Sequence, residues 1–179
     1  MGKHEKTELT NICAQTMIIK VTKAEQLPIC LDIIHKSFQT VAEDLHLTRE
    51  NCPGHTAFMP AEKLRAAFDG GCSLFLCRYQ NTFAGCFSLH PTADGATLDH
   101  LAVLPPYRHL GLGKELVGYA AKYAKDHLGA QKIQIGIVEE NTVLKSPRGS
   151  FTQAQNNLTI SPLPWDLWSL NFSFTKIRY

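Results

Sequence analysis

The segment from Leu98 to Lys114, LDHLAVLPPYRHLGLGK, constrains the fold of this chain more than any other. It predicts an apolar strand that ends at two prolines, then a loop with two glycines, and then a helix with apolar residues three or four positions apart. Glycines let a backbone approach a ligand closely, and the unpaired N–H groups of a first helical turn, with the positive end of the helix dipole, face an anion. We therefore expect this corner to hold a phosphate or diphosphate group.

Spacing disfavours two common classes of glycine loop. A Walker-type loop does not fit, because Arg108 occupies the position of its first glycine and Glu115 replaces the hydroxyl residue that would hold magnesium. A dinucleotide fingerprint does not fit either, because Leu116 stands where a third glycine or alanine belongs. An ordinary strand-loop-helix corner, in which the glycines serve only packing, stays open as the simpler alternative.

The order Val-x-Pro-x-x-Arg-x-x-Gly-x-Gly resembles the acetyl-CoA-binding signature of the GNAT superfamily of N-acetyltransferases, at Val103, Pro105, Arg108, Gly111 and Gly113. The resemblance extends over residues 16–145. It implies an α/β (mixed α+β) fold: a central mixed, largely antiparallel sheet with helices on both faces and a splayed parallel strand pair at the cofactor site. It also implies transfer of an acetyl group from acetyl-CoA to an amine of a small molecule or protein.

The resemblance implies roles for particular residues. Leu101, Ala102 and Val103 are expected to hydrogen-bond the pantetheine arm through their backbone, as an added strand would. The loop is expected to hold the pyrophosphate, mainly through main-chain N–H groups, at Arg108, His109, Leu110, Gly111, Leu112, Gly113 and Lys114. Asn141 matches a family position that touches the cofactor, and a helix N-cap is its alternative role. No metal site is expected, since the six cysteines include no Cys-x-x-Cys pair and no histidine at zinc-ligand spacing.

Direct attack on a thioester requires a neutral amine. An ammonium with a pKa near 10.4 must first lose a proton, at a cost of about 4 kcal/mol at pH 7, so we expect a general base in the site. Strict strand alternation places Thr97, Asp99, Leu101 and Val103 on one face, and Leu98, His100 and Ala102 on the other. The resemblance implies a base in the register of Thr97 or Asp99. Asp99 is the candidate, with a merely solvated carboxylate as the alternative, and His100 would face away.

The remaining sequence is typical of a globular chain with one domain. It has 179 residues, 44% of them hydrophobic and 19% charged, with a net charge of +2. There is no dense basic tract and no run of eighteen apolar residues, so neither nucleic acid nor a membrane is an expected partner. The N-terminus lacks an apolar signal core. We expect a cytoplasmic monomer or homodimer whose partner is its amine acceptor.

Other periodicities supply the order of elements in an acetyltransferase-like core at residues 1–145. The predicted order of elements begins with a loose segment at 1–15, followed by a strand at 16–22, a helical region from residue 23 to Leu45 and a shorter helix after Pro60. Strands at 72–79 and 82–90 follow as a hairpin around Gln80-Asn81. A strand at 96–104, a helix at 111–128 and a strand at 132–138 complete the core.

Residues 146–179 depart from the family pattern. Pro147 halts the helix that family members continue, and the family's tyrosine, which can protonate the leaving thiolate, has no counterpart before Tyr179. The span 150–159 is polar, and 167–179 is a candidate strand. An alternative function follows from this departure: a protein that binds acyl-CoA but is catalytically impaired or regulatory. The acceptor, the general acid and the part of the tail in the substrate pocket stay open.

Overall fold

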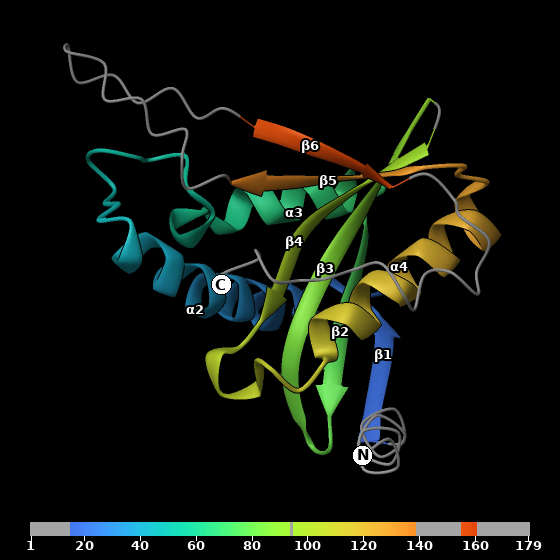
Figure 1. Cartoon of the computed structure of the whole chain (residues 1–179), viewed down its shortest axis with the longest axis horizontal. Coiled ribbons are helices and arrows are strands. Elements are labelled where there is room, and N and C mark those ends of the chain that lie inside the picture. Colours follow the sequence, from blue (N-terminus) through green and yellow to red (C-terminus); the bar gives the residue numbers. More distant parts are fainter. Residues whose placement is uncertain (1–14, 94, 139–154, 161–179) are drawn as a thin grey trace, which may run out of the picture.

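A mixed sheet of six strands organises the protein, and its strands lie side by side in chain order (Figure 1). The computed structural model describes residues 15–93, 95–138 and 155–160. The strands are β1 (Thr16–Lys20), β2 (Ser73–Tyr79), β3 (Thr82–Thr92), β4 (Gly95–Val103), β5 (Ile133–Val138) and β6 (Gln155–Ile160). Neighbouring strands pair antiparallel except β4 and β5, which are parallel. The predicted mixed, largely antiparallel sheet is confirmed.

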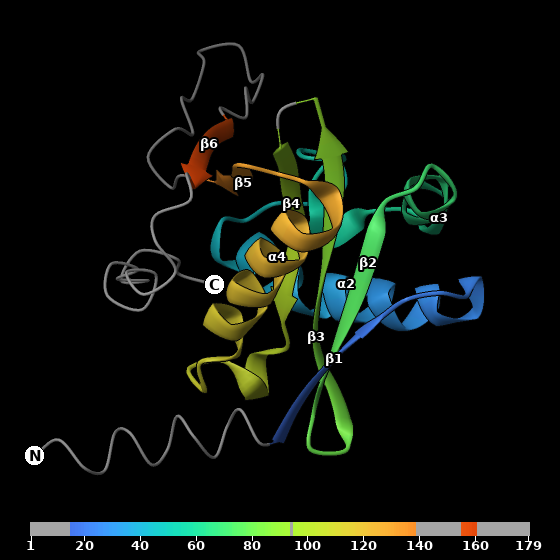
Figure 2. The same cartoon turned by 90° about the vertical axis from the view of Figure 1, so that its right-hand side faces the viewer.

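Helices cover both faces of this sheet, as predicted (Figure 2). The helices α2 (Leu27–Asp44) and α3 (Ala61–Asp69) pack on one face, here called the α2 side, and α4 (Leu112–Leu128) packs on the other. Three short 3-10 turns are η1 (Ala24–Gln26), η2 (Thr56–Phe58) and η3 (Pro105–Tyr107). The helix α4 ends at Gly129, whose φ of 63° is the left-handed conformation that glycine adopts at helix C-termini. No helix in the described ranges is long and apolar enough to cross a lipid bilayer.

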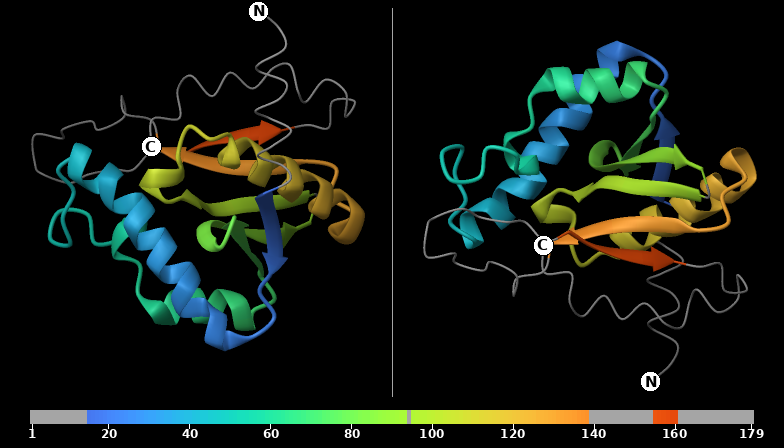
Figure 3. Two further views of the ribbon diagram at one scale, coloured as in Figure 1. Left: turned by 90° about the horizontal axis from the view of Figure 1, so that it is seen from below. Right: turned by 90° about the horizontal axis from the view of Figure 1, so that it is seen from above.

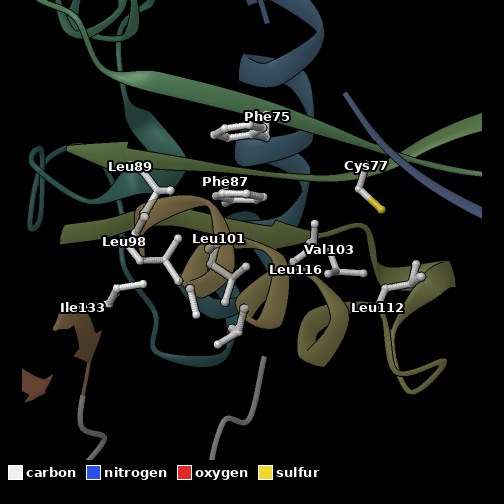
Figure 4. Close-up of a cluster of buried hydrophobic side chains, with 14 of the residues drawn as sticks. Phe75, Cys77, Phe87, Leu89, Leu98, Leu101, Val103, Leu112, Leu116 and Ile133 are labelled. Carbon is white, nitrogen blue, oxygen red and sulfur yellow. The ribbon is translucent and has the colours of Figure 1, made fainter. Parts of the chain in front are cut away.

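Each face of the sheet buries its own apolar cluster. Beneath α4, Phe75 and Phe87 stack with their ring centroids 4.7 Å apart, and both are fully buried (Figure 4). On the α2 side, Leu64 of α3 joins side chains of α2, β2 and β3. The strand β2 contributes to both clusters because successive residues point to opposite faces, with Phe75 toward α4 and its neighbours Leu74 and Leu76 toward α2.

The strand β4 contains a β-bulge. Its register with β3 pairs Asp99 with Ser88 and Ala102 with Cys86, so two residues of β4 stand opposite one residue of β3. One of the two, His100, has a φ of 52°, a left-handed conformation that is uncommon for residues other than glycine. Because the bulge inserts one residue, each side chain of β4 after it points to the opposite face from the one that strict alternation would give.

This shift shows that the faces predicted from strict alternation were wrong. Leu101 and Val103 lie with Leu98 in the cluster beneath α4, not on the face of Asp99. Asp99 and His100, which alternation separates, both approach side chains of β3 that lie on the α2 side. Alternation along the strand cannot show an inserted residue, because the bulge is defined by the pairing of β4 with β3.

β4 and β5 run side by side only at their beginnings. Their register ends at Leu98 opposite Ile135, and the two strands then diverge (Figure 1). β5 pairs along its whole length with β6 instead, and these two strands lie together at one edge of the sheet (Figure 3). The predicted splayed parallel pair is confirmed. Within the described ranges, residues 99–103 have no partner strand on the β5 side.

The strand β6 was not predicted from the sequence. The polar span 150–159 indicated a connection, yet Gln155–Ile160 form an antiparallel strand beside β5. Main-chain hydrogen bonds are sufficient for such pairing, and polar residues are typical of sheet edges, so no alternating apolar pattern announces the strand. The candidate strand at 167–179, the helix stop at Pro147 and the predicted loose residues 1–14 lie outside the described residues.

The variant Phe75→Ala is expected to lower the free energy of unfolding by about 3–5 kcal/mol, because it removes a fully buried ring and leaves a cavity. Met17→Ala is the control, since Met17 is 50% exposed, and it should change the free energy by less than about 0.5 kcal/mol. Urea denaturation measures both values. A loss for Phe75→Ala no larger than that of the control would contradict the packing described here.

Candidate functional site

The predicted anion-binding corner lies between β4 and α4. After η3 the backbone passes through two left-handed residues, His109 with a φ of 64° and Gly111 with a φ of 82°. Gly111 is the N-cap of α4 and has no side chain to cap the helix, which begins at Leu112, one residue later than predicted. Glu115 N–H donates to the Gly111 carbonyl at 3.2 Å, so the N–H groups of residues 112–114 precede the first helical hydrogen bond. They point outward as donors for an anion.

Gly113 keeps space open at the first turn of α4. A Cβ built at this position meets no atom within 4 Å, and the backbone there is not left-handed. A side chain could therefore be added without strain in the protein. Because the Cα–Cβ bonds of a helix tilt toward its N-terminus, such a side chain would project toward the outward-pointing N–H groups. The space fits an anionic ligand.

The diverging segment of β4 offers its main chain beside this corner. Within the described ranges the residues of β4 after Leu98 have no partner on the β5 side, so the main-chain groups of Leu101, Ala102 and Val103 on that side are not engaged in pairing with β5. The segment leads through η3 directly into the glycine loop. A ligand with an amide-bearing arm and a diphosphate fits, because the arm can pair with β4 while the diphosphate meets the loop.

Arg108 makes several hydrogen bonds within the protein. Its guanidinium donates hydrogen bonds to the Val103 carbonyl at 3.2 Å, to Thr40 Oγ1 at 3.0 Å and to the Ser37 carbonyl at 2.7 Å. Its main-chain N–H donates to the Pro105 carbonyl at 3.3 Å. Arg108 therefore fastens the end of β4 to α2. The sequence could not show this, because Thr40 and Ser37 lie far from Arg108 along the chain. The contact of Arg108 with the pyrophosphate stays a prediction, as does that of the N–H groups of residues 109–114.

Four polar residues gather where β4 leaves β5, and we call them the polar cluster: Ser88 and His90 of β3, Asp99 and His100 of β4. Ser88 Oγ donates to the Asp99 carbonyl oxygen at 3.1 Å and lies 2.9 Å from His100 Nδ1. His90 Nε2 lies 3.7 Å from Asp99 Oδ2. The cluster is on the α2 side, because Ser88 and His90 alternate along β3 with residues that pack beneath α4.

The members of the polar cluster differ in their exposure to solvent. The side chains of His90 and Asp99 are 36% and 39% exposed, whereas Ser88 is fully buried. Burial lowers the pKa of His100 below its ordinary value of 6.5, and the nearby charge of Asp99 acts against this shift. Burial raises the pKa of the neighbouring Cys72 thiol to about 11. At neutral pH the cluster thus presents a neutral imidazole beside a protonated thiol, next to the partly exposed side chain of Asp99.

Sequence reasoning identified one member of this cluster as a candidate base, Asp99. It turned His100 to the wrong face and did not consider Ser88 or His90. The alternation of these two polar residues with large apolar ones in β3 was a usable signal, but their meeting with Asp99 depends on the register between strands. The predicted cofactor residue Asn141 lies outside the described residues. In the part of the chain that the structure describes, no three His, Cys, Asp or Glu side chains converge as they would around a metal ion.

Comparisons with known proteins give one family. The model described as the acetyltransferase (GNAT) family matches residues 38–145, which is more than half of the chain. No curated protein matches the sequence.

Solved structures resemble the fold. A GNAT family acetyltransferase from Elizabethkingia anophelis with acetyl-CoA bound is 16% identical at a TM-score of 0.55, over 83% of this chain and 99% of that one. A spermidine N-acetyltransferase SpeG chimera from Vibrio cholerae and hSSAT is 12% identical at a TM-score of 0.58, over 87% and 99%. The PaiA N-acetyltransferase from Thermoplasma acidophilum in complex with coenzyme A is 18% identical at 0.53, over 71% and 83%. At these identities the likeness shows the fold alone.

The variant Gly113→Val is expected to weaken binding of acetyl-CoA by about tenfold or more, which corresponds to 1.4 kcal/mol, because its side chain fills the space at the first turn of α4. Gly118→Val is the matched control, since Gly118 is in the same helix and a Cβ built there also meets no atom within 4 Å. Calorimetric titration gives both dissociation constants, and thermal unfolding checks both folds. Equal affinities would argue against the site.

The variant Arg108→Ala is expected to lower the free energy of unfolding by about 1–3 kcal/mol without any cofactor, because it removes three hydrogen bonds from a charged donor. Arg108→Lys keeps the charge but not the planar fork, so it should recover only part of that loss. Urea denaturation of the cofactor-free protein measures both. An unchanged midpoint for Arg108→Ala would speak against the fastening role and for a contact with phosphate.

Proposed function

This chain belongs to the GNAT family of acetyltransferases, and from that premise we propose that it moves an acetyl group from acetyl-CoA to an amine of a small molecule or protein. The observation that carries this proposal is the divergence of β4 from β5 directly before the uncapped N-terminus of α4. These two features together fit the arm and the diphosphate of coenzyme A, and neither needs a metal ion.

The cofactor residues in this proposal act through their main chain. Leu101, Ala102 and Val103 pair with the pantetheine arm, and the N–H groups of residues 109–114 hold the diphosphate, with Arg108 as a further contact. The end of the pairing between β4 and β5 at Leu98 and the free space at Gly113 support this division. Asn141 stays in the proposal as a further cofactor contact, on the strength of the family pattern.

Asp99 is the general base of first choice. It is the first residue of β4 beyond the last pair with β5, and its partly exposed carboxylate can draw a cationic amine. Acetyl-CoA supplies an activated thioester carbonyl, so the protein's task is to bind the amine, remove its proton and exclude water. Removing that proton at pH 7 accounts for about 4 kcal/mol of the barrier for an alkylamine, which a positioned base can reduce.

A second candidate function is binding of acyl-CoA without turnover. It is motivated by the departure from the family pattern after Lys145 and by the missing tyrosine. The strand β6 favours turnover, because it restores a paired strand on the outer edge of β5, where family members complete the substrate pocket. The missing tyrosine also costs little, since a thiol with an ordinary pKa near 8.5 leaves readily as a thiolate.

The direct test is incubation of the purified protein with acetyl-CoA and a panel of amines: polyamines, small aromatic amines and lysine-containing peptides. Release of coenzyme A is followed by chromatography, because the six cysteines of the chain would consume a thiol reagent. We expect release above the blank without amine. Calorimetric binding of acetyl-CoA with no release for any amine would select the second candidate, and absence of binding would refute both.

The variant Asp99→Asn is expected to lower kcat/KM by about 10²-fold or more, the usual contribution of general base catalysis, while the dissociation constant of acetyl-CoA stays unchanged. Asp32→Asn is the control, because Asp32 pairs with Lys36 on the exposed surface of α2. Steady-state kinetics with the best amine of the panel measures both variants. A kcat/KM for Asp99→Asn equal to that of the control would remove Asp99 from the chemistry.

A further inference from the structure

We propose that His100 Nε2 is a second proton acceptor in the amine site and that Ser88 is the positioning residue that keeps it available. This inference rests on the proposed function and names the group that takes the proton at neutral pH. Three features of the structure support it: the tautomer that Ser88 imposes, the bulge that turns the ring to the α2 side, and the ionisable groups around the ring.

Two contacts of one hydroxyl carry the tautomer that we assign to His100. Ser88 Oγ lies 3.1 Å from the Asp99 carbonyl oxygen, which can only accept a hydrogen bond, and we assign the single hydroxyl proton to this contact. With that assignment His100 Nδ1, which lies 2.9 Å from the same Oγ, is the donor of the second hydrogen bond. In a neutral imidazole with its proton on Nδ1, the lone pair is on Nε2. Ser88 thereby selects the nitrogen that can accept a proton.

The bulge in β4 decides which side of the sheet the ring occupies. In a regular strand His100 would point away from Asp99. With its φ of 52°, it meets Ser88 on the α2 side instead. Residues other than glycine in this conformation concentrate at functional sites, where their surroundings hold them. Two consecutive residues of one strand therefore face the same site.

The groups around His100 keep its imidazole neutral at pH 7. The ionisable groups that face it are Asp99 on β4, His90 on β3 and Lys63 on α3, and the thiol of Cys72, the residue before β2, lies against the same cluster. Burial is the largest influence and lowers the pKa of His100 from 6.5; His90 and Lys63 act in the same direction, and Asp99 opposes them. A neutral imidazole carries a lone pair on its unprotonated nitrogen and can take the proton of an amine through it.

Bonds and protons balance in the proposed step. A substrate ammonium beside the Asp99 carboxylate gives one proton to Nε2, and His100 becomes an imidazolium. The neutral nitrogen forms a C–N bond with the thioester carbonyl carbon, the C–S bond breaks, and the second proton of the nitrogen passes to the leaving sulfur. The products are an amide and the thiol of coenzyme A, and His100 returns its proton to water. Asp99 attracts the amine in this step, a role that Asp99→Asn alone does not separate from proton removal.

The tautomer can be measured without turnover. Long-range ¹H–¹⁵N correlation spectra at pH 7.5 are expected to show Nδ1 of His100 protonated in the wild type. The signal is assigned by its loss in His100→Asn, a variant chosen because asparagine tolerates a positive φ, and thermal unfolding checks its fold. Ser88→Ala is expected to lose this tautomer, and Ser88→Thr, which retains the hydroxyl, is expected to keep it.

Kinetics with the best amine supply the second readout. The kcat/KM of the wild type should decline at acid pH as His100 takes up a proton at a pKa below its ordinary value of 6.5, because only the neutral ring accepts. His100→Asn is expected to lose about 10²-fold at pH 7.5 and to lack this decline, and Ser88→Ala to lose about tenfold, with recovery in Ser88→Thr. The dissociation constant of acetyl-CoA should stay within about twofold in all three variants, since none of them touches the cofactor corner.

The outcomes separate this inference from the function on which it rests. A proton on Nε2 in the wild type, or a decline at acid pH that persists in His100→Asn, would overturn the role of His100 and leave acetyl transfer standing. A wild type that binds acetyl-CoA but acetylates no amine would overturn the proposed function, and the role of His100 would fall with it.

Discussion

The parting of β4 from β5 after Leu98 is the constraint on which the rest of the site depends. The strands are held together at their beginnings, and β5 then keeps only β6 as a partner. Main-chain groups that lose a partner in this way need water or a ligand to replace it. The same stretch of β4 continues through η3 into the glycine loop, so the groups proposed for the arm and for the diphosphate follow one another along a single segment of backbone.

Two further devices shape the α2 side of this segment. The bulge in β4 brings Asp99 and His100 to one face, so a carboxylate and an imidazole sit together where an alternating strand would offer only one of them. Arg108 joins the end of β4 to α2 through Val103 and Ser37. The helix on the amine side is thereby fastened to the strand on the cofactor side, although the two belong to distant parts of the sequence.

Much of the fold was predictable because its elements depend on local rules. The glycine loop, the apolar spacing of α4 and the turn between β2 and β3 are each set by neighbouring residues, and the structure places these elements within a few residues of the prediction. The features that the sequence did not predict depend on contacts between distant residues. β6 is defined by its pairing with β5, and the partners of the Arg108 side chain lie on α2. Neither leaves a periodic pattern to detect.

By itself, the sequence determined the resemblance to the acetyltransferase family, the glycine loop at Arg108 to Lys114 and the candidacy of Asp99. A glycine spacing and a helix start are local properties of the chain, which is why they could be identified in advance. Only the tertiary structure decided that His100 shares a face with Asp99, that Ser88 lies within hydrogen-bonding distance of both residues and that β6 pairs along the edge of β5. Each of these depends on the register between strands, and register is fixed by the packing of the whole sheet rather than by any segment of it.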